Sequence, residues 1–441
     1  MSQLPPYRTS LRLTQKQREL IDDLCRSDGG KVTMNTWIAK AVEEKIQRDT
    51  QPGQDQAIRS ARPGRRFYEF FAGGGMARAG LGPNWDCLFA NDISPMKSRV
   101  YRDNWNGGLD LLVQDVNTVT SEQLPEQADL VWASFPCQDL SLAGAYKGIG
   151  RALDAQQTRS GTFWPFWGLM QNLMDEGRAP TVIVLENVYG VLTSNQGQDF
   201  AAIGSVLAEA GYRFGAMVID ACYFVPQSRP RVFIVAVRTQ VDIAPSLMSP
   251  GPVEPWHPAR MVSAYAGLCP AAQKLWVWWA LPMPWTPVNT FTAIIEENPQ
   301  GVTWDSVEKT QQLLDMMSPT NLAKVRAVQK SGQRKVGGLY KRTRLDEQGH
   351  KVQRAEVRFD DLAGCLRTPA GGSSRQSILL VEGDTIRSRL LSPREAARLM
   401  GLDDSYQLPS NYNDAYHVAG DGVAVPVVRH LAHCLFEPIL A

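Results

Sequence analysis

The sequence has no excess of charge of either sign, no long apolar run and no apolar signal-peptide core at its start. Its 46 Lys and Arg residues balance 45 Asp and Glu residues, which gives a net charge of +1 over 441 residues. This balance provides no global attraction to a polyanion, so any basic surface must be local. The lack of apolar runs predicts a cytoplasmic protein with no membrane partner.

Cysteines occur in the sequence, but never as close pairs. There is no Cys-x-x-Cys motif and no close grouping of cysteine with histidine, which argues against a metal site and against a disulfide framework. Scattered thiols fit a reducing compartment. The seven cysteines are Cys25, Cys87, Cys137, Cys222, Cys269, Cys365 and Cys434.

Residues 1–50 have the pattern of a strand followed by two helices. Alternation near the start precedes a Thr-x-x-Gln capping-box sequence and two amphipathic stretches. Because a lone strand needs a partner, this β-α-α unit resembles the ribbon-helix-helix DNA-binding family. The resemblance implies a homodimer whose ribbon residues Arg8, Ser10 and Arg12 face DNA. A solvated helical hairpin that only dimerises or adds basic charge is an equally good interpretation.

The region from residue 67 to about 115 reads as the nucleoside-binding half of an α/β sheet. An apolar strand leads into a glycine turn at residues 72–77, and the next two strands end near Asp92 and Asp115. Glycines let a backbone approach a ligand closely, and an acid at the end of the second strand commonly binds ribose hydroxyls. The lysine of a phosphate-binding loop is missing. The pattern therefore predicts an adenosine cofactor without phosphates.

Two later strands deliver a candidate nucleophile and a candidate acid. Residues 129–132 lead into Pro136-Cys137-Gln138, and residues 181–185 lead into Glu186. Each residue alone is more often a buried thiol or a surface charge, but neighbouring strands ending in Cys and Glu would form one site at the rim of the sheet.

A third polar group precedes the strand at residues 232–237. Gln227, Arg229 and Arg231 alternate in sequence, so an extended backbone places them on one face. Arginine at a strand edge has the alternative function of opposing aggregation.

These motifs, in this order, resemble those of the DNA cytosine-5 methyltransferases. The resemblance covers residues 67–441, with a variable gap from about 240 to 355. It implies an S-adenosylmethionine-dependent, Rossmann-like α/β sheet domain with a smaller, mostly irregular or β target-recognition domain. The matching segments are residues 71–75, 136–138, 186–188, 227–231, 391–401 and 416–426.

The chemistry of the reaction supports this interpretation. Carbon 5 of cytosine is a poor nucleophile, and addition of a thiolate at carbon 6 converts the ring into an enamine that attacks a sulfonium methyl group. Cys137 would be this thiolate, Glu186 the acid at ring nitrogen 3, Arg229 part of an electropositive setting, and Arg231 the group that holds the cytosine carbonyl oxygen. The target base in duplex DNA must be flipped out of the stack.

The resemblance also implies binding residues for the cofactor and for the DNA substrate. The cofactor, S-adenosyl-L-methionine, would contact Phe71, Gly73, Gly75, Asp92, Ile93, Asp115, Pro136, Asp421 and Gly422. The substrate would contact Gln138, Ser141, Asn187 and Gln227.

Two residues depart from the family pattern. Glu69 stands where the family usually has Asp, and Asp421 stands where it usually has Asn. An Asp keeps the acceptor of Asn but loses the amide donor and adds charge. The usual Arg-Gly pair after the nucleophile motif appears as Arg159-Ser160-Gly161.

The predicted domain order places the variable part between two segments of the catalytic domain. A basic tract lies between residues 324 and 358 and would neutralise DNA phosphates, whereas the tryptophans of the region are expected to be core residues. The predicted domains are residues 1–50 (N-terminal module), 51–66 (linker), 67–239 (catalytic), 240–385 (target recognition) and 386–441 (hinge and C-terminal segment).

Two other functions fit parts of the sequence. A tRNA cytosine-5 methyltransferase would use the same chemistry, although the Cys-Phe-Thr tract associated with those relatives is absent. A non-catalytic DNA-binding regulator would need none of the residues Cys137, Glu186, Arg229 and Arg231, all of which are intact. The N-terminal module could limit synthesis of the protein by binding its own promoter, and a cognate restriction endonuclease would be a matter of gene neighbourhood.

Overall fold

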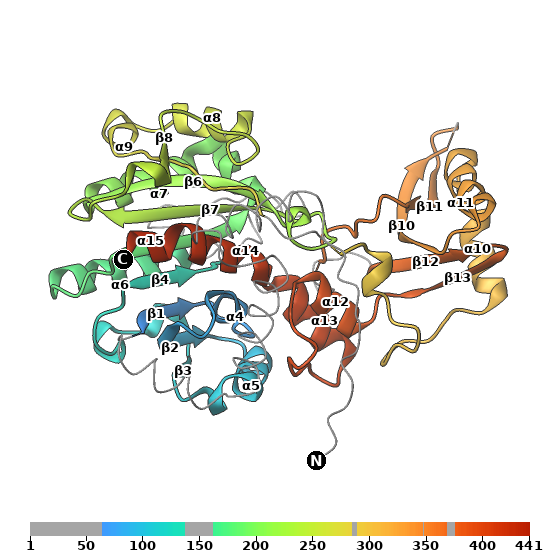
Figure 1. Ribbon diagram of the computed structural model, residues 1–441, viewed down its shortest axis with the longest axis horizontal. Helices are drawn as coiled ribbons and strands as arrows, with labels where there is room; N and C mark the ends of the chain where they lie inside the picture. The colour runs from blue at the N-terminus through green and yellow to red at the C-terminus, as the bar shows by residue number, and fades with distance from the viewer. Residues whose placement is uncertain (1–63, 137–161, 285–288, 347, 368–374) are drawn as a thin grey trace, which may run out of the picture. The chain divides into compact units, whose positions relative to one another are not determined.

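A mixed seven-stranded sheet forms the centre of the structure, which is a computed structural model (Figure 1). Residues 64–136, 162–284, 289–346, 348–367 and 375–441 are described. The predicted N-terminal module and the predicted site residues Cys137, Gln138 and Ser141 lie outside these ranges. Residues 65–441 form one unit, to which the following description is confined.

The order of the strands reverses direction at one point within the sheet. The order is β3-β2-β1-β4-β5-β7-β6. The first five strands in this order run parallel to one another, whereas β7 is antiparallel to both of its neighbours, β5 and β6. Chain direction across the sheet changes between β1 and β4, which is where open α/β sheets bind ligands. The strands are β1 (Arg65–Phe70), β2 (Trp85–Asp92), β3 (Leu111–Val113), β4 (Leu130–Ala133), β5 (Val182–Val188), β6 (Tyr212–Asp220) and β7 (Pro230–Arg238).

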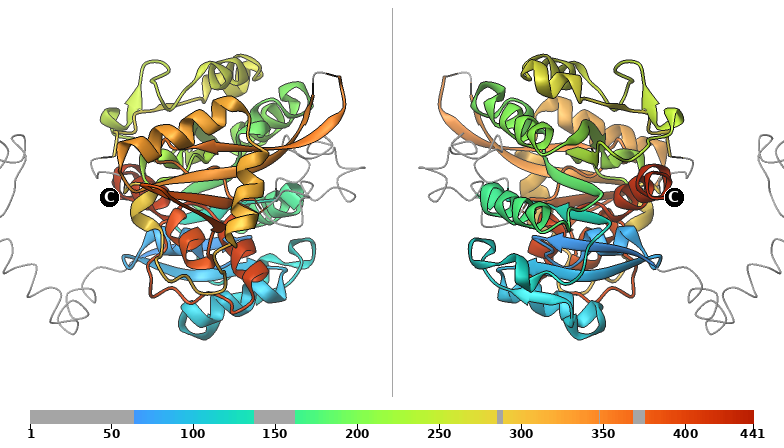
Figure 2. Two further views of the ribbon diagram at one scale, coloured as in Figure 1. Left: turned by 90° about the vertical axis from the view of Figure 1, so that its right-hand side faces the viewer. Right: turned by 90° about the vertical axis from the view of Figure 1, so that its left-hand side faces the viewer.

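Helices cover both faces of the sheet (Figure 2). Aromatic and aliphatic side chains of α6 (Phe163–Asp175) and α7 (Gln198–Glu209) pack on one face. The other face is covered by α4 (Met76–Leu81) and α14 (Val425–Leu431). The predicted α/β fold is thereby confirmed.

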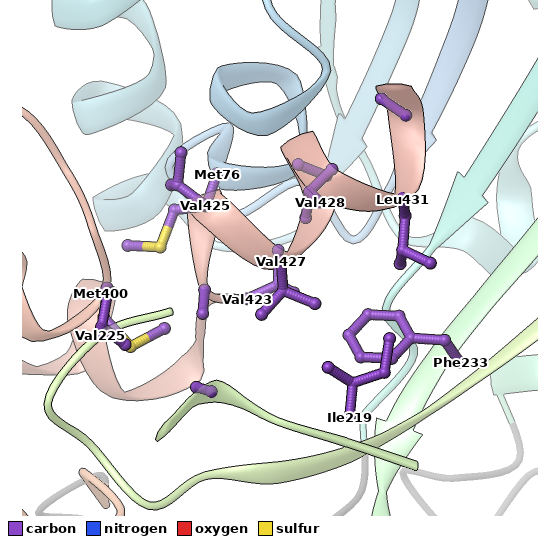
Figure 3. Packing of buried hydrophobic residues seen from close by; sticks show 14 of the residues in the cluster. Met76, Ile219, Val225, Phe233, Met400, Val423, Val425, Val427, Val428 and Leu431 are labelled. Atoms are coloured by element: carbon purple, nitrogen blue, oxygen red, sulfur yellow. The ribbon is translucent and has the colours of Figure 1, made fainter. Parts of the chain in front are cut away.

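The C-terminal helix α14 packs closely on α4 and on β6 and β7 (Figure 3). A side chain at Gly80 of α4 would collide with Val428, so the small residue allows the two helices to approach. After α14 come a π-helical turn (Ala432–Phe436) and α15 (Glu437–Ile439). Glu437 accepts hydrogen bonds from Arg65 Nη2 (3.4 Å, through its carbonyl) and Trp85 Nε1 (3.3 Å, through its carboxylate). The two ends of this unit are therefore neighbours.

Residues 245–279 form an extension that packs at the β6 edge. The backbone of Phe214 in β6 exchanges hydrogen bonds with Leu275 (3.0 Å) and Val277 (2.7 Å). Trp256 and Trp279 are fully buried, which confirms that these tryptophans are core residues. The elements are β8 (Met248–Ser249), α8 (Ala259–Ala266), α9 (Pro270–Lys274) and β9 (Trp278–Trp279). The predicted boundary at residue 240 stays a prediction.

A second, four-stranded antiparallel sheet spans residues 335–390 and so extends beyond the variable gap. Its order is β11-β10-β12-β13, and two helices pack on one of its faces through a separate apolar cluster. The elements are α10 (Val307–Asp315), α11 (Pro319–Ser331), β10 (Lys335–Leu345), β11 (Lys351–Arg358), β12 (Ser377–Glu382) and β13 (Thr385–Leu390).

A buried ion pair joins β13 to the helix that follows it, α12 (Pro393–Leu399). Arg389 and Glu395 form a two-fold contact of 2.8 and 2.6 Å, and both side chains are 0% exposed. Ser392 and Glu395 also make a capping box, which explains where α12 begins. The next helix, α13 (Tyr412–Asp421), leads to the turn before α14. Within the described ranges, no helix has the length and apolar character needed to span a membrane.

Candidate active site

The glycine loop after β1 is held in place by two aromatic side chains. Trp105 Nε1 and Tyr406 Oη both donate to the carbonyl of Gly74, at 2.9 and 2.7 Å. A side chain at Gly74 would collide with Tyr406, and one at Gly75 with Trp105. Packing inside the protein therefore requires glycine at these two positions, and the cofactor contact predicted for Gly75 stays a prediction.

Gly73 differs from its neighbours because an added side chain would collide with none of the described residues. Its φ is +57°, and among these residues an added Cβ would meet only Lys97 Cδ, at 3.9 Å. The Gly73 amide donates to Asp92 Oδ2 (2.8 Å), and the Ser94 amide donates to Asp92 Oδ1 (2.7 Å). These bonds fix the Asp92 carboxylate at the end of β2, beside the glycine loop.

The remaining predicted cofactor residues near this loop are arranged around the same strand ends. Phe71 follows β1 with a φ of 57°, a left-handed conformation that turns the chain at the sheet edge. Ile93 follows β2 and is 63% exposed, which is unusual for a large aliphatic side chain. Asp115 follows β3, and its Oδ1 accepts from the Asn117 amide at 3.0 Å.

The turn between α13 and α14 lies against the start of α4, the helix that follows the glycine loop. Gly422 lies against Met76, the first residue of α4, so that a side chain there would collide with the Met76 sulfur. Asp421 Oδ2 forms an ion pair with Lys97 Nζ at 2.7 Å. The structure thus brings Asp421 near Gly73 and Asp92 and adds Lys97, which sequence reasoning had missed. The signal for it was a lysine five residues after Asp92, together with the extra acid at 421.

Glu186 and Arg231 meet across the pair of strands β5 and β7. Val188 lies opposite Arg231 in the antiparallel register, so Glu186, two residues earlier, has its side chain on the same face. Arg231 Nε lies 3.3 Å from Glu186 Oε1, and both side chains are largely buried. This arrangement brings an acid and a cation together at the end of β5.

Asn187 links this strand end to that of β4. Its Nδ2 donates to the Phe135 carbonyl at 3.3 Å, immediately before Pro136, and its Oδ1 accepts from the Val188 amide at 2.8 Å. β4 and β5 are parallel neighbours, which confirms the expected adjacency of the two strands. The Glu186–Arg231 pair and Pro136 therefore lie at the same edge of the sheet.

Arg229 is a buried clamp between three segments of the chain. Its side chain is surrounded by protein, with 2% of the residue exposed. Nη2 donates to the carbonyls of Gly420 and Gly422, both at 2.8 Å, and Nη1 donates to the Leu366 carbonyl at 3.2 Å. Arg229 thus ties the α13–α14 turn to the segment before residue 368.

Gln227, two residues before Arg229, also joins distant segments of the chain. It is 0% exposed, and its Nε2 donates to the Leu399 carbonyl at 2.7 Å while its Oε1 accepts from the Leu366 amide at 3.1 Å. The contacts of Gln227 and Arg229 with Leu366 confirm that the two side chains share a face. Both ends of the Gln227 amide are engaged with backbone groups inside the protein.

Cys365 lies beside both arginines and was not selected from the sequence. Its Sγ is 3.4 Å from Arg229 Nη1 and 4.0 Å from Arg231 Nη2. Burial alone would raise the pKa of this thiol, but the two guanidinium groups outweigh that effect and hold the pKa below its ordinary value. The group shows how strongly electropositive this part of the site is.

Glu69, a departure from the family pattern, lies in β1 beneath the glycine loop. Burial raises the pKa of its carboxyl group from 4.5 to about 8, despite the opposing effect of Arg78. Oε1 accepts from the Arg78 amide at 3.4 Å, and Oε2 has no hydrogen-bond partner among the described residues. Burial therefore favours the protonated, neutral form of Glu69.

The second sheet presents a face rich in arginine on the side away from α10 and α11. Register places Arg342 opposite Arg354, with Arg344 and Arg358 on the same face, while Ala355 on the other face is buried against the helices. All four arginines are exposed. Glu356 forms ion pairs with Arg342 and Arg344, and Asp360 forms one with Arg358, so the four arginines outnumber their two acidic partners.

An α/β sheet with acids and arginines gathered at the carboxyl ends of its strands is the architecture of enzymes that use a nucleoside-type cofactor. More specifically, residues 65–437 match the model of the family described as C-5 cytosine-specific DNA methylase. The chain belongs to this family. Among the described residues, no group of three or more His, Cys, Asp or Glu side chains is arranged to hold a metal ion.

Curated relatives match most of the chain at low identity. The type II methyltransferase M.HhaI of Haemophilus parahaemolyticus is 23% identical over 377 residues, which cover 84% of this chain and 94% of the relative. The DNA-cytosine methyltransferase of Escherichia coli K12 is 25% identical over 406 residues, which cover 85% and 77%. These matches confirm the family resemblance drawn from the motifs but do not support the ribbon-helix-helix resemblance.

Solved structures share the fold. The Entamoeba histolytica methyltransferase EhMeth has a TM-score of 0.53 and 13% identity, over 85% of this chain and 99% of the other. A Spodoptera frugiperda DNMT2 mutant has a TM-score of 0.52 and 18% identity, over 85% and 100%.

Proposed function

We propose that the chain transfers a methyl group from S-adenosylmethionine to carbon 5 of a cytosine in a specific short sequence of duplex DNA. The observation that carries this proposal is the Glu186–Arg231 pair at the carboxyl edge of the sheet, next to Pro136, in a chain of the C-5 cytosine methylase family. Relatives with DNA-cytosine methyltransferase in their names support DNA as the substrate.

The described residues fit an adenosine cofactor that has no phosphates. Gly73 offers an open backbone, Asp92 offers a fixed carboxylate for ribose hydroxyls, and Ile93 offers an exposed apolar surface for a base. Among the described residues the side-chain hydrogen bonds of Asp115 use Oδ1, so its Oδ2 would accept from an amino group. Phe71, Gly75, Pro136, Asp421 and Gly422 complete the proposed set. When bound, S-adenosylmethionine supplies the methyl group.

The chain's own residues would activate the cytosine. We assign Cys137 as the thiolate that forms a bond to carbon 6, while Glu186 donates a proton to ring nitrogen 3 and the ring electrons shift to carbon 5. Carbon 5 would take the methyl group, with S-adenosylhomocysteine as the leaving group, and would then lose its proton to a base. Nitrogen 3 would return its proton to Glu186 as the bond between Cys137 and carbon 6 breaks to restore the thiolate. Arg231, held by Glu186, would hold the carbonyl oxygen of the base.

The other predicted residues divide into substrate contacts and positioning groups. Gln138 and Ser141 would contact DNA or the flipped base, and Asn187 positions the strand end that carries the nucleophile. The contacts of Arg229 and Gln227 with backbone carbonyls support positioning for both, with the Arg229 charge also contributing to the electropositive setting of the thiolate.

DNA phosphates would be bound by the arginine-rich face of the second sheet. Arg342, Arg344, Arg354 and Arg358 are exposed on one side of an antiparallel ribbon, as phosphate contacts require. Residues 240–385 would then form the recognition domain, and residues 386–441 the return to the catalytic domain. A cytoplasmic location, a cognate restriction endonuclease and dimerisation through residues 1–50 are further parts of the proposal.

The decisive experiment is bisulfite sequencing of DNA from a methylation-free host that expresses the full chain. The expected result is methylated cytosine at one short recurring sequence, which is lost in Cys137→Ala. Cys269→Ala is the matched control, because this exposed thiol lies in another part of the described structure and should leave methylation intact. Methyl incorporation into tRNA only, or none with folded protein, would contradict the proposal.

A further inference from the structure

Lys97 lies at the point where the proposed cofactor residues converge. It is the third residue of α5 (Pro95–Asn104), whose start is capped by Ser94. Its Nζ lies 2.7 Å from Asp421 Oδ2, and its Cδ lies 3.9 Å from the position that a Cβ would take on Gly73. The side chain therefore runs past the open side of the glycine loop to the α13–α14 turn.

The charge state of Lys97 is secured by two acids. Burial alone would lower the pKa of the ammonium group, but Asp421 and Asp92 outweigh this effect and hold the pKa above its ordinary value. Lys97 is 21% exposed and Asp421 37% exposed, so the ion pair is open to solvent on one side. A permanent cation and an acid thus stand side by side, accessible, next to Gly73.

This pair matches the chemistry of one end of the proposed cofactor. Asp92 and Ile93 suit a ribose and a base, and the other end of an adenosyl amino acid is a zwitterion with one carboxylate and one ammonium group. A lysine and an aspartate side by side present the two complementary charges.

We propose that Lys97 and Asp421 bind the amino-acid end of the adenosyl cofactor, Lys97 taking its carboxylate and Asp421 its ammonium group. The inference rests on the proposed function for the identity of the cofactor. It explains why an Asp is accepted where the family usually has Asn, because the added negative charge has both a fixed cation and a cationic ligand group as partners.

Calorimetric titration of the full chain with two ligands tests the proposal without turnover. S-adenosylhomocysteine has the amino-acid end, and 5′-methylthioadenosine has the same adenosine and thioether without it. In Lys97→Met we expect the Kd for S-adenosylhomocysteine to rise about 10- to 100-fold, the range for loss of a hydrogen bond to a charged group. The Kd for 5′-methylthioadenosine should change less than about twofold.

Three further variants sharpen the test. Lys97→Arg keeps the charge and should restore most of the affinity for S-adenosylhomocysteine, and Asp421→Asn should lose a smaller factor, about 3- to 10-fold, for the same ligand only. Lys309→Met removes the lysine of a comparable ion pair, with Asp305 in another part of the fold, and should change neither Kd.

Three outcomes would overturn the proposal. Equal weakening of both ligands in Lys97→Met would show that the pair only shapes the site, and unchanged binding of both would show that it has no role. If the wild-type chain bound S-adenosylhomocysteine no better than 5′-methylthioadenosine, the amino-acid end would have no site. Binding of neither ligand by folded wild-type protein would instead overturn the cofactor assignment on which the inference rests.

Discussion

Glu69 makes the stability of the protein depend on pH in a direction opposite to that of a salt-bridged carboxylate. Its pKa is raised to about 8 in the folded state by burial, against 4.5 for an ordinary Glu. Between these two values the folded protein holds a proton that the unfolded chain has released. Stability that is fully present below pH 4.5 must therefore be lost progressively as the pH rises to about 8.

The substitution Glu69→Gln isolates this effect, because the amide has nearly the same shape and does not titrate. Each pH unit between the two pKa values changes the free energy of unfolding by about 1.4 kcal/mol, or roughly 4 kcal/mol from pH 5 to pH 8. Relative to the variant, the wild-type protein should lose stability by that amount over the range. The difference should level off above pH 8.

Urea unfolding of both proteins at pH 5, 6, 7 and 8 measures the difference, with equal m-values as the control for unchanged unfolding behaviour. All other titrating groups are common to the two proteins, so their contributions cancel. Parallel plots of stability against pH for wild type and Glu69→Gln would refute the reasoning, because they would show that Glu69 is ionised in the folded state.

Three further predictions concern other parts of the structure. Tyr406→Phe removes one of the two hydrogen bonds to the Gly74 carbonyl and should lower the free energy of unfolding in urea by about 1 kcal/mol. An unchanged urea midpoint would show that this hydrogen bond does not stabilise the protein. Arg389→Met leaves the Glu395 carboxylate buried without its cation and should cost about 3–5 kcal/mol by the same assay, whereas a loss below about 1 kcal/mol would contradict the buried pair. Arg354→Ala should weaken DNA binding equally for all sequences and reduce the salt slope by about one, as measured by fluorescence anisotropy; a changed sequence preference would rule out a phosphate contact.

Much of the sheet was readable from the sequence because its strands contain short apolar runs. Asp115 follows β3 as expected, whereas Asp92 is the last residue of β2 and Glu186 lies inside β5, two residues before its end. The antiparallel direction of β7 was not readable, because a strand buried on both faces has the same apolar run in either direction.

The site was harder to predict because its contacts join distant parts of the chain. Gln227 and Arg229 looked like residues that face a substrate, but their partners are backbone groups 139 to 193 positions away. A sequence gives no sign of such partners, since a backbone carbonyl has no residue type. Lys97 was missed for a related reason, because a single lysine in a helix acquires meaning only through Asp421.

Because Glu437 contacts Arg65 and Trp85, the fold does not depend on the order in which its segments follow one another along the gene. A short connection between residues 437 and 65 would close the chain into a ring, and new ends could then be opened at an exposed turn such as residues 348–350, between β10 and β11. Such a circular permutant would keep every strand and every contact of the glycine loop. The architecture therefore leaves evolution, or an engineer, free to reorder the motifs without rebuilding the sheet.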